Sequence, residues 1–185
     1  MNKMHETKLR VLVVDDSLDY LKAVSSLLVT YPCVEMIDRA LTASEALEKL
    51  NLASTALMPN LVLLDIALPD GNGLDIARMI KAAPRSAKVV MVTLYDTPVY
   101  RAAAFAAGTD GFLGKSDLGE HLQTVISDLF PQICPPPADA HAPEGTLRIG
   151  TDEKVRRVPF GGEATPQRDT PQAAHAQGEK RRREN

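Results

Sequence analysis

The stretch VLVVDD, residues 11–16, runs four aliphatic residues directly into two aspartates. Such a run, ending abruptly at a polar residue, is typical of a buried parallel strand that presents a functional group at the carboxyl edge of a sheet. Open α/β sheets place their ligand sites at this edge. Three further stretches have the same form: LVLLD at 61–65, VVMVT at 89–93 and GFLGK at 111–115.

The segments between these runs have the pattern of helices. Leu21, Val24 and Leu28 are spaced as residues on one buried helical face, and Pro98 stands where a first-turn proline belongs. The expected strands are 9–14, 34–38, 61–64, 88–92 and 111–113, and the expected helices are 17–30, a segment from about 44, 74–83, 97–107 and 117–130.

Five strands that alternate with five helices indicate an α/β fold with a mostly parallel sheet. Both faces of the sheet are covered, because each parallel connection must cross over. Periodicity alone does not give the strand order. The flavodoxin-like order 2-1-3-4-5 is one of two common doubly wound arrangements.

The composition divides the chain into three parts: an N-terminal extension at 1–7, a domain at 8–130 and a tail at 131–185. Nearly all large aliphatic residues lie in the domain, whereas eight of the thirteen prolines lie in the tail. A segment so poor in apolar residues cannot offset its ordering entropy, so we expect the tail to be disordered. Within it, TLRIG at 146–150 and KVRRVPF at 154–160 are candidate strands that would be unstable in isolation.

Charge and hydropathy narrow the range of partners. The net charge of −3 is too small to indicate nucleic-acid binding, and the basic run at 180–183 is more typical of a solvated tail than of a polyanion-binding arm. The tail shows no recognition-helix pattern, so no nucleic-acid-binding residues are assigned. No apolar stretch approaches the roughly 18 residues that a membrane span requires, and we expect a cytoplasmic protein with no membrane partner.

The two cysteines, Cys33 and Cys134, lie far apart in the sequence and in no spacing typical of a metal or redox site. This usage fits a reducing cytosol and gives no disulfide framework. We expect both thiols to be inert.

The polar ends of the strands suggest phosphoryl chemistry. If the first and third strands are neighbours, Asp15, Asp16 and Asp65 crowd into one pocket and repel unless a cation joins them. Mg²⁺ suits carboxylate oxygens and water, with phosphate oxygens completing its octahedron. Thr93 and Lys115 then supply a hydroxyl and an ammonium for phosphoryl oxygens, which favours a carboxylate that itself becomes an acyl phosphate.

Together these features resemble the receiver domain of two-component response regulators. The resemblance covers residues 8–130. It rests on the Asp15-Asp16 pair, LVLLDIALPDGNGLD around Asp65, VVMVTLYD with Thr93, and AAGTDGFLGK ending at Lys115 with an aromatic residue three positions earlier.

The resemblance implies a role for each matching residue. Asp65 is the phosphoacceptor, and Lys115 pairs with the phosphoryl oxygens. Thr93 and Phe112 form a switch that responds to the phosphoryl group. The Mg²⁺ ligands it implies are the carboxylates of Asp15, Asp16 and Asp65 and the backbone carbonyl of Ala67.

The resemblance also implies partners. A histidine kinase or histidine phosphotransfer protein supplies the phosphoryl group, the output protein is unknown, and homodimerisation upon phosphorylation is left open. Ser116 after Lys115, and the Tyr95-Asp96 pair, recur in receivers attached to helix-turn-helix output domains. No such output domain follows here, so we favour a stand-alone receiver that acts through protein contacts, with a truncated transcriptional regulator as the alternative.

The sequence is also compared with two other functional classes that use a similar acidic pocket or fold. A Mg²⁺-dependent phosphohydrolase commonly carries an acid two residues after its nucleophile, where this chain has Ala67, so the protein is not expected to be an enzyme beyond its own phosphorylation and dephosphorylation. The other class is a phosphorylation-independent interaction module. Its binding surface would include Tyr95, Tyr100, Ala103 and Ala104.

Single residues also have structural explanations. Taken alone, Asp15 or Asp16 would cap a helix, Thr93 would be an ordinary β-branched strand residue, and Phe112 would fill a core position. Gly71 and Gly73 are interpreted as permissive loop positions. No role is assigned to the four histidines.

Overall fold

The computed structural model describes residues 8–52, 57–84 and 86–136. The N-terminal extension at 1–7 and the tail from 137 onward, with both of its candidate strands, lie outside the described residues. The expectation that the tail lacks an ordered output domain therefore stays a prediction. Among the described residues, no helix is both long and apolar enough to cross a membrane.

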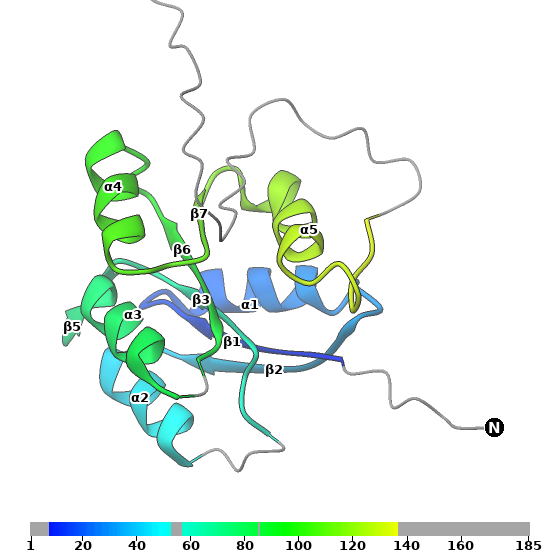
Figure 1. The fold of residues 1–185 in the computed structure, drawn as a ribbon, viewed down its shortest axis with the longest axis horizontal. Coiled ribbons are helices and arrows are strands. Elements are labelled where there is room, and N and C mark those ends of the chain that lie inside the picture. The colour runs from blue at the N-terminus through cyan, green and yellow to red at the C-terminus, as the bar shows by residue number, and fades with distance from the viewer. Residues whose placement is uncertain (1–7, 53–56, 85, 137–185) are drawn as a thin grey trace, which may run out of the picture. The chain divides into compact units, whose positions relative to one another are not determined.

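A five-stranded parallel sheet forms the centre of the domain (Figure 1). Its strands are β1 (Leu9–Val14), β2 (Val34–Ala40), β3 (Leu61–Leu64), β6 (Lys88–Thr93) and β7 (Gly111–Gly114). They lie in the order β2-β1-β3-β6-β7, which confirms the order 2-1-3-4-5. Val14 pairs with both Ala40 and Leu64, so the carboxyl ends of the three neighbouring strands lie level with one another.

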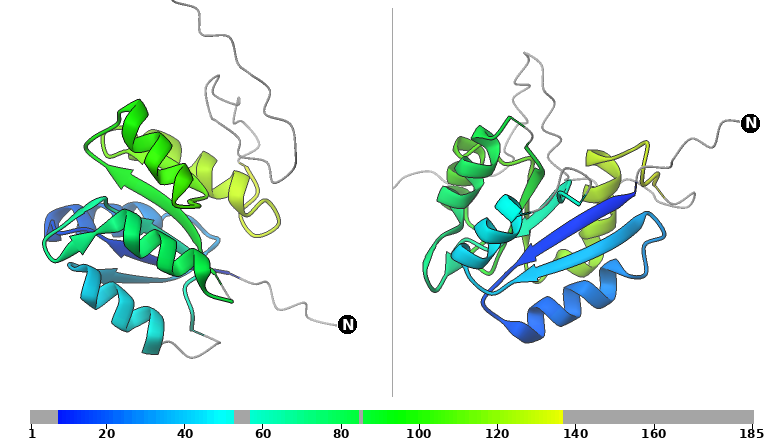
Figure 2. Two further views of the ribbon diagram at one scale, coloured as in Figure 1. Left: turned by 60° about the vertical axis from the view of Figure 1, so that its left-hand side comes forward. Right: turned by 90° about the horizontal axis from the view of Figure 1, so that it is seen from below.

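Helices cover both faces of this sheet, as the two turned views show (Figure 2). The helices are α1 (Leu18–Leu28), α2 (Ala43–Leu52), α3 (Gly73–Ala82), α4 (Pro98–Ala106) and α5 (Leu118–Leu129). Alternate residues of each strand point to opposite faces and so build two cores. One core packs under α1 and α5, and the other under α2, α3 and α4.

Short polar residues set the helix ends. Ser17, Thr42 and Thr97 each accept a hydrogen bond from a backbone N–H of the following first turn. The helix α4 begins at Pro98, as its sequence predicts. It is followed by Gly108 at a φ of 82°, a left-handed conformation that glycine adopts at little cost.

A two-stranded hairpin follows β3 where the sequence predicts only a loop. It consists of β4 (Ala67–Leu68) and β5 (Gly71–Asn72). Asp70, in the turn between them, accepts hydrogen bonds from the N–H groups of Ala43 and Ser44 at 2.7 and 2.9 Å. The hairpin is thereby tied to the first turn of α2.

The expectation of two inert thiols is wrong, because Cys33 and Cys134 form a disulfide with a Cα–Cα distance of 5.4 Å. Cys33 directly precedes β2, and Cys134 follows the end of α5. The strands and the antiparallel α5 bring these two positions to the same amino-terminal end of the sheet. A separation of 101 residues along the chain therefore gives no measure of their distance in space.

A second long-range link joins the last turn of α3, the start of β6 and the residue before β7. The carboxylate of Asp110 accepts hydrogen bonds from Lys81 at 2.8 Å, Lys88 at 2.9 Å and the Val89 N–H at 2.9 Å. Burial disfavours its charged form, but the three hydrogen bonds outweigh burial and hold the pKa of Asp110 below its ordinary value.

We expect loss of the disulfide to destabilise the domain. The double substitution Cys33→Ser and Cys134→Ser should lower the free energy of unfolding by about 2–4 kcal/mol, because it removes a crosslink over a long loop. Urea denaturation measures the change, and the reduced wild type should match the double variant. Protein purified without reductant that carries two free thiols, with unchanged stability on adding reductant, would contradict the pairing.

Asp110→Asn should lower the free energy of unfolding at neutral pH by about 1–3 kcal/mol, because two charge-assisted hydrogen bonds are lost. The pKa of Asp110 is depressed in the folded state. Its contribution is therefore fully present above the unfolded pKa, near 3.8, and is lost as the pH falls through the folded value. The variant and the wild type should converge in stability at acid pH.

The matched control for this prediction is Asp75→Asn, which breaks an exposed pair with Arg78 on α3. Exposed pairs of this kind contribute about 0–1 kcal/mol. Equal pH profiles for wild type and Asp110→Asn would contradict the assigned role of Asp110.

Candidate functional site

The predicted phosphoacceptor lies in an ion-paired cluster at the carboxyl edge of the sheet. The Nζ of Lys115 is 2.5 Å from Oδ2 of Asp15 and 2.7 Å from Oδ2 of Asp65. Asp15 is 1% exposed and Asp65 is 5% exposed, so both carboxylates are shielded from bulk water. One ammonium thus contacts both buried acids and offsets one of the two negative charges that would otherwise repel each other.

The parallel strands bring these residues together. The backbone N–H of Asp15 donates to the carbonyl of Ala40, and that of Asp65 donates to the carbonyl of Val14. The N–H of Lys115 likewise donates to the carbonyl of Thr93. Each charged residue therefore continues the sheet hydrogen bonding by one position beyond its strand, which fixes its backbone.

Asp16 completes an acidic triad. One carboxylate oxygen each from Asp15, Asp16 and Asp65 lies within 4.8 Å of the others, and Asp16 is exposed. Three convergent carboxylates, one of them open to solvent, fit a hard divalent cation that takes oxygen ligands and keeps several waters. The residues present therefore fit the cation that the sequence predicts.

Burial and pairing act on the ionisable groups in opposite ways. Burial raises the pKa of Asp15, and the contacts with Lys115 and the Ser17 N–H only partly counter it. Burial also disfavours the Lys115 ammonium, but its hydrogen bonds to Asp15 and Asp65 outweigh burial and raise the pKa of Lys115. The ammonium therefore stays protonated in this cluster.

The two oxygens of Asp65 have different partners. Oδ1 accepts hydrogen bonds from the N–H of Ile66 at 2.6 Å and from that of Ala67 at 3.4 Å. Oδ2 accepts a hydrogen bond from the side-chain ammonium of Lys115 at 2.7 Å. The backbone thus fixes the orientation of the carboxylate and leaves Oδ2 as the oxygen with an exchangeable partner.

The predicted switch residues lie next to this cluster in the sheet but have other side-chain partners. Thr93 is fully buried, and its Oγ1 accepts a hydrogen bond from the Tyr95 N–H at 3.1 Å. Phe112 is 7% exposed and packs in the core under α4. The Arg101 guanidinium lies 4.8 Å from its ring centroid and also pairs with Asp96.

The surface suggested for an interaction module is present in part. Tyr95 is 56% exposed, and its ring lies 5.8 Å from that of Tyr100. Ala104, however, is fully buried against the sheet, so its expected surface role is wrong. The residue lies on the inner side of α4, which the alanine-rich sequence of this helix did not distinguish from its outer side.

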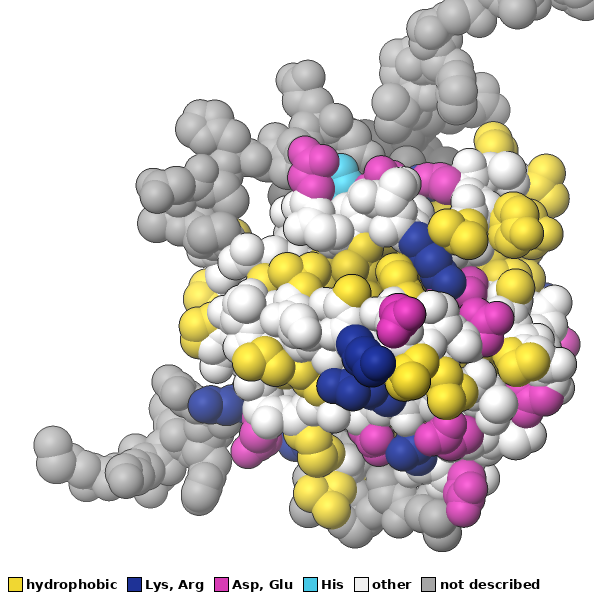
Figure 3. All heavy atoms as spheres, turned by 180° about the vertical axis from the view of Figure 1, so that it is seen from behind, with side chains coloured by type: hydrophobic (Ala, Val, Ile, Leu, Met, Phe, Trp, Pro, Cys, Tyr) yellow, Lys and Arg dark blue, Asp and Glu magenta, His cyan; other side chains and the backbone are white. Residues whose placement is uncertain are grey.

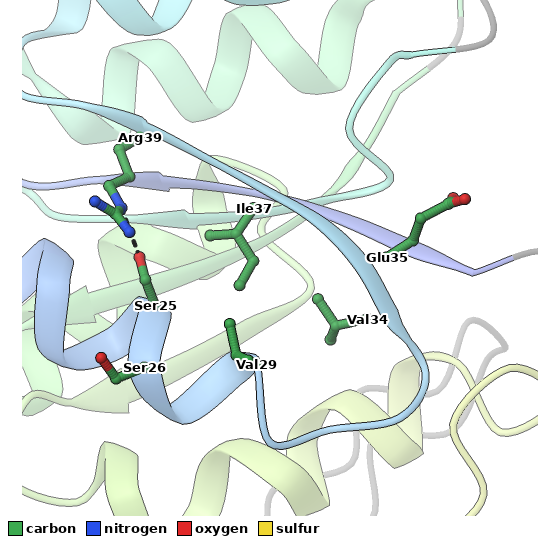
Figure 4. A pocket seen from close by; sticks show the side chains of 7 residues that line it. All are labelled: Ser25, Ser26, Val29, Val34, Glu35, Ile37 and Arg39. Atoms are coloured by element: carbon green, nitrogen blue, oxygen red, sulfur yellow. Dashed lines mark hydrogen bonds between the residues drawn. The ribbon is translucent and has the colours of Figure 1, made fainter.

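A separate hollow of about 410 Å³ lies between α1 and β2, and Figure 4 shows its lining. In it, Nε of Arg39 donates to Oγ of Ser25 at 2.8 Å. Its lining includes none of the predicted site residues. On the rear face of the domain, basic, acidic and hydrophobic side chains are intermingled (Figure 3).

Sequence reasoning missed one aromatic residue at the cluster. Tyr20, in the first turn of α1, places its ring under the Lys115 ammonium, with Nζ 4.7 Å from the ring centroid. The available signal was its position in the first turn of the helix that directly follows the Asp15-Asp16 pair.

Comparison with known proteins agrees with the fold and with the arrangement of the site residues. The family model described as "Response regulator receiver domain" matches residues 11–127. The chain belongs to this family. A solved CheY-like receiver domain protein from Methanospirillum hungatei JF-1 has 28% identity and a TM-score of 0.55, covering 68% of this chain and 96% of that one. It has the same fold as the receiver domain described here.

Two curated relatives of this receiver are longer proteins. The protein-glutamate methylesterase/protein-glutamine glutaminase of a Nocardioides strain is 32% identical over 68% of this chain and 35% of its own length. The DNA-binding transcriptional activator DevR/DosR of Mycobacterium tuberculosis is 26% identical over 65% of this chain and 54% of its own length. The chain thus spans about a third to a half of these relatives.

Gly73 lies directly against the backbone of Asp65. A Cβ at this position would lie 1.9 Å from the carbonyl oxygen of Asp65, and the Gly73 N–H donates to Ile66. Gly73→Ala should therefore lower the free energy of unfolding by about 1–3 kcal/mol, because backbone atoms must shift.

Gly119→Ala is the matched control, because a Cβ there has open space. It should be neutral or stabilise α5 by about 0.5–1 kcal/mol. Thermal and urea denaturation measure both variants, and equal stability of Gly73→Ala and wild type would contradict the close approach.

Proposed function

We propose that this receiver domain takes a phosphoryl group on Asp65 from a histidine kinase or a histidine phosphotransfer protein, and that the modification switches its binding to a partner protein. The acidic triad with Lys115 spanning Asp15 and Asp65 carries this proposal. It combines a carboxylate nucleophile with an ammonium suited to phosphoryl oxygens.

In the transfer step, Oδ2 of Asp65 attacks phosphorus and forms the new P–O bond. The bond from phosphorus to the donor's leaving group breaks, and that group departs with the electron pair. With acetyl phosphate as donor, the products are the acyl phosphate and acetate, and no proton is required. Lys115 then exchanges Oδ2 for a phosphoryl oxygen, so its positive charge follows the negative charge.

Asp15, Asp16 and Asp65, with the backbone carbonyl of Ala67, would hold Mg²⁺. Bound there, the ion neutralises charge on the phosphoryl oxygens. The three carboxylates themselves need such a cation once Lys115 turns toward the phosphoryl group, because Asp15 then loses part of its neutralising partner. This requirement supports Mg²⁺ dependence of the reaction.

The response runs through Thr93 and Phe112. A phosphoryl oxygen accepts a hydrogen bond from the Thr93 O–H, and turning the hydroxyl toward it releases the hydrogen bond that Oγ1 accepts from the Tyr95 N–H at the start of the loop before α4. Phe112 packs under that helix and against Arg101, a residue of the helix itself, and three large hydrophobic side chains in the preceding loop and the first turn are exposed: Leu94, Tyr95 and Val99. A change at this loop therefore alters an apolar surface that a partner protein can bind.

The activities in the names of the longer relatives belong to those proteins. For this chain we propose output through protein contacts, in the cytoplasm, without membrane or direct DNA binding and without turnover of an external substrate. Ala67 supports the last point, because a phosphohydrolase would have an acid there. In a cytoplasmic setting the Cys33–Cys134 disulfide would be reduced for much of the time.

The primary test is the intact mass of the protein after incubation with Mg²⁺ and acetyl phosphate. We expect the wild type to gain one phosphoryl group, and Asp65→Asn or the wild type with EDTA to gain none. Asp19→Asn is the matched control, because this carboxylate lies in the first turn of α1 and its side chain is 96% exposed.

Absence of a phosphoryl adduct on the wild type under all conditions would contradict the proposed function. Partner binding that is unchanged by Asp65→Asn would instead support a phosphorylation-independent interaction module.

A further inference from the structure

We propose that the ring of Tyr20 is a positioning element for Lys115, which keeps the ammonium at the cluster while its carboxylate partner changes. The proposal rests on the proposed function. Its starting observation is the distance of 4.7 Å from Nζ of Lys115 to the centroid of the Tyr20 ring. An ammonium over an aromatic face is attracted by the negative face of the ring, and more strongly where water is excluded.

The backbone of Tyr20 is tied to the same cluster. Its N–H donates to Oγ of Ser17 at 3.2 Å, and the Ser17 N–H donates to Oδ1 of Asp15 at 3.0 Å. The other oxygen of Asp15 holds Lys115. Contacts therefore run in a closed circuit from Asp15 through Ser17 and Tyr20 to Lys115 and back to Asp15.

Asp65, the proposed phosphoacceptor, is not part of this circuit. When Asp65 becomes an acyl phosphate, its charge moves to the phosphoryl oxygens and the ion pair through Oδ2 is lost. The ring contact does not depend on that oxygen. Tyr20 therefore keeps the Lys115 ammonium at the cluster while its partner changes from the Asp65 carboxylate to the phosphoryl group. Less of the orientation of the ammonium is then lost on the way to the transition state.

The state of the phenol is consistent with this role. Burial, followed by the charges of Asp15 and Asp65, raises the pKa of Tyr20, so the ring stays neutral beside the two acids. Its hydroxyl is buried and has no hydrogen-bond partner among the residues that the structure describes. The ring face, rather than the hydroxyl, makes the contact with Lys115, and a phenylalanine should therefore replace it.

The test compares Tyr20→Phe, which keeps the ring, with Tyr20→Leu, which keeps an apolar side chain but removes the aromatic face. The readout is the apparent second-order rate constant of phosphorylation by acetyl phosphate with saturating Mg²⁺. We expect a loss of about 3- to 10-fold for Tyr20→Leu and a change within about twofold for Tyr20→Phe. Thermal denaturation confirms that both variants are folded at the assay temperature.

A double-mutant cycle separates positioning of Lys115 from a general structural role. In a Lys115→Met background, Tyr20→Leu should cause no further loss of phosphorylation rate, because the group that the ring positions is absent. An equal fold-loss in both backgrounds would overturn the proposal.

The other outcomes are also decisive. An unchanged rate for Tyr20→Leu would overturn the proposal, and an equal loss for Tyr20→Phe and Tyr20→Leu would assign the effect to the hydroxyl and overturn the ring contact. A wild type that accepts no phosphoryl group would overturn the proposed function together with this inference. A wild type that is phosphorylated normally beside an unaffected Tyr20→Leu would overturn this inference alone.

Discussion

The ion pairing of one lysine with two buried aspartates is the interaction on which the carboxyl edge of the sheet depends. Lys115 lies 2.5 Å from Asp15 and 2.7 Å from Asp65, and it thereby joins the ends of β1, β3 and β7. Buried carboxylates this close repel unless a cation lies between them. The two buried acids are compatible with a folded domain because the ammonium of Lys115, which follows the edge strand β7, reaches them.

The same pairing gives the edge two ways to balance its charge. In the structure described here the ammonium serves both acids, and with a divalent ion in the acidic triad it would be free to serve a phosphoryl group. Neither arrangement requires the sheet to move, because the backbone of each acid is held by hydrogen bonds that continue the strands. The adjustable parts are side chains and the loop before α4, where Thr93 holds the Tyr95 N–H.

Long-range links elsewhere in the domain hold both ends of the sheet. Asp70 ties the hairpin behind Asp65 to the first turn of α2, and Gly73 allows that hairpin to return against the Asp65 carbonyl. At the opposite end of the sheet, the disulfide of Cys33 and Cys134 joins the beginning of β2 to the segment after α5. The strand ends are therefore held from several directions, which suits a site whose groups must exchange partners without disordering.

The amino-acid sequence by itself determined the alternation of strands and helices and the position of Asp15, Asp16, Asp65 and Lys115 directly after strands. Apolar runs that end in polar residues specify buried parallel strands, and all parallel strands end at one edge. Only the tertiary structure decided the Cys33–Cys134 pairing, the burial of Ala104 and the place of the Tyr20 ring under Lys115. These features depend on how elements distant in the chain approach one another, and the periodicity within a single strand or helix carries no information about that approach.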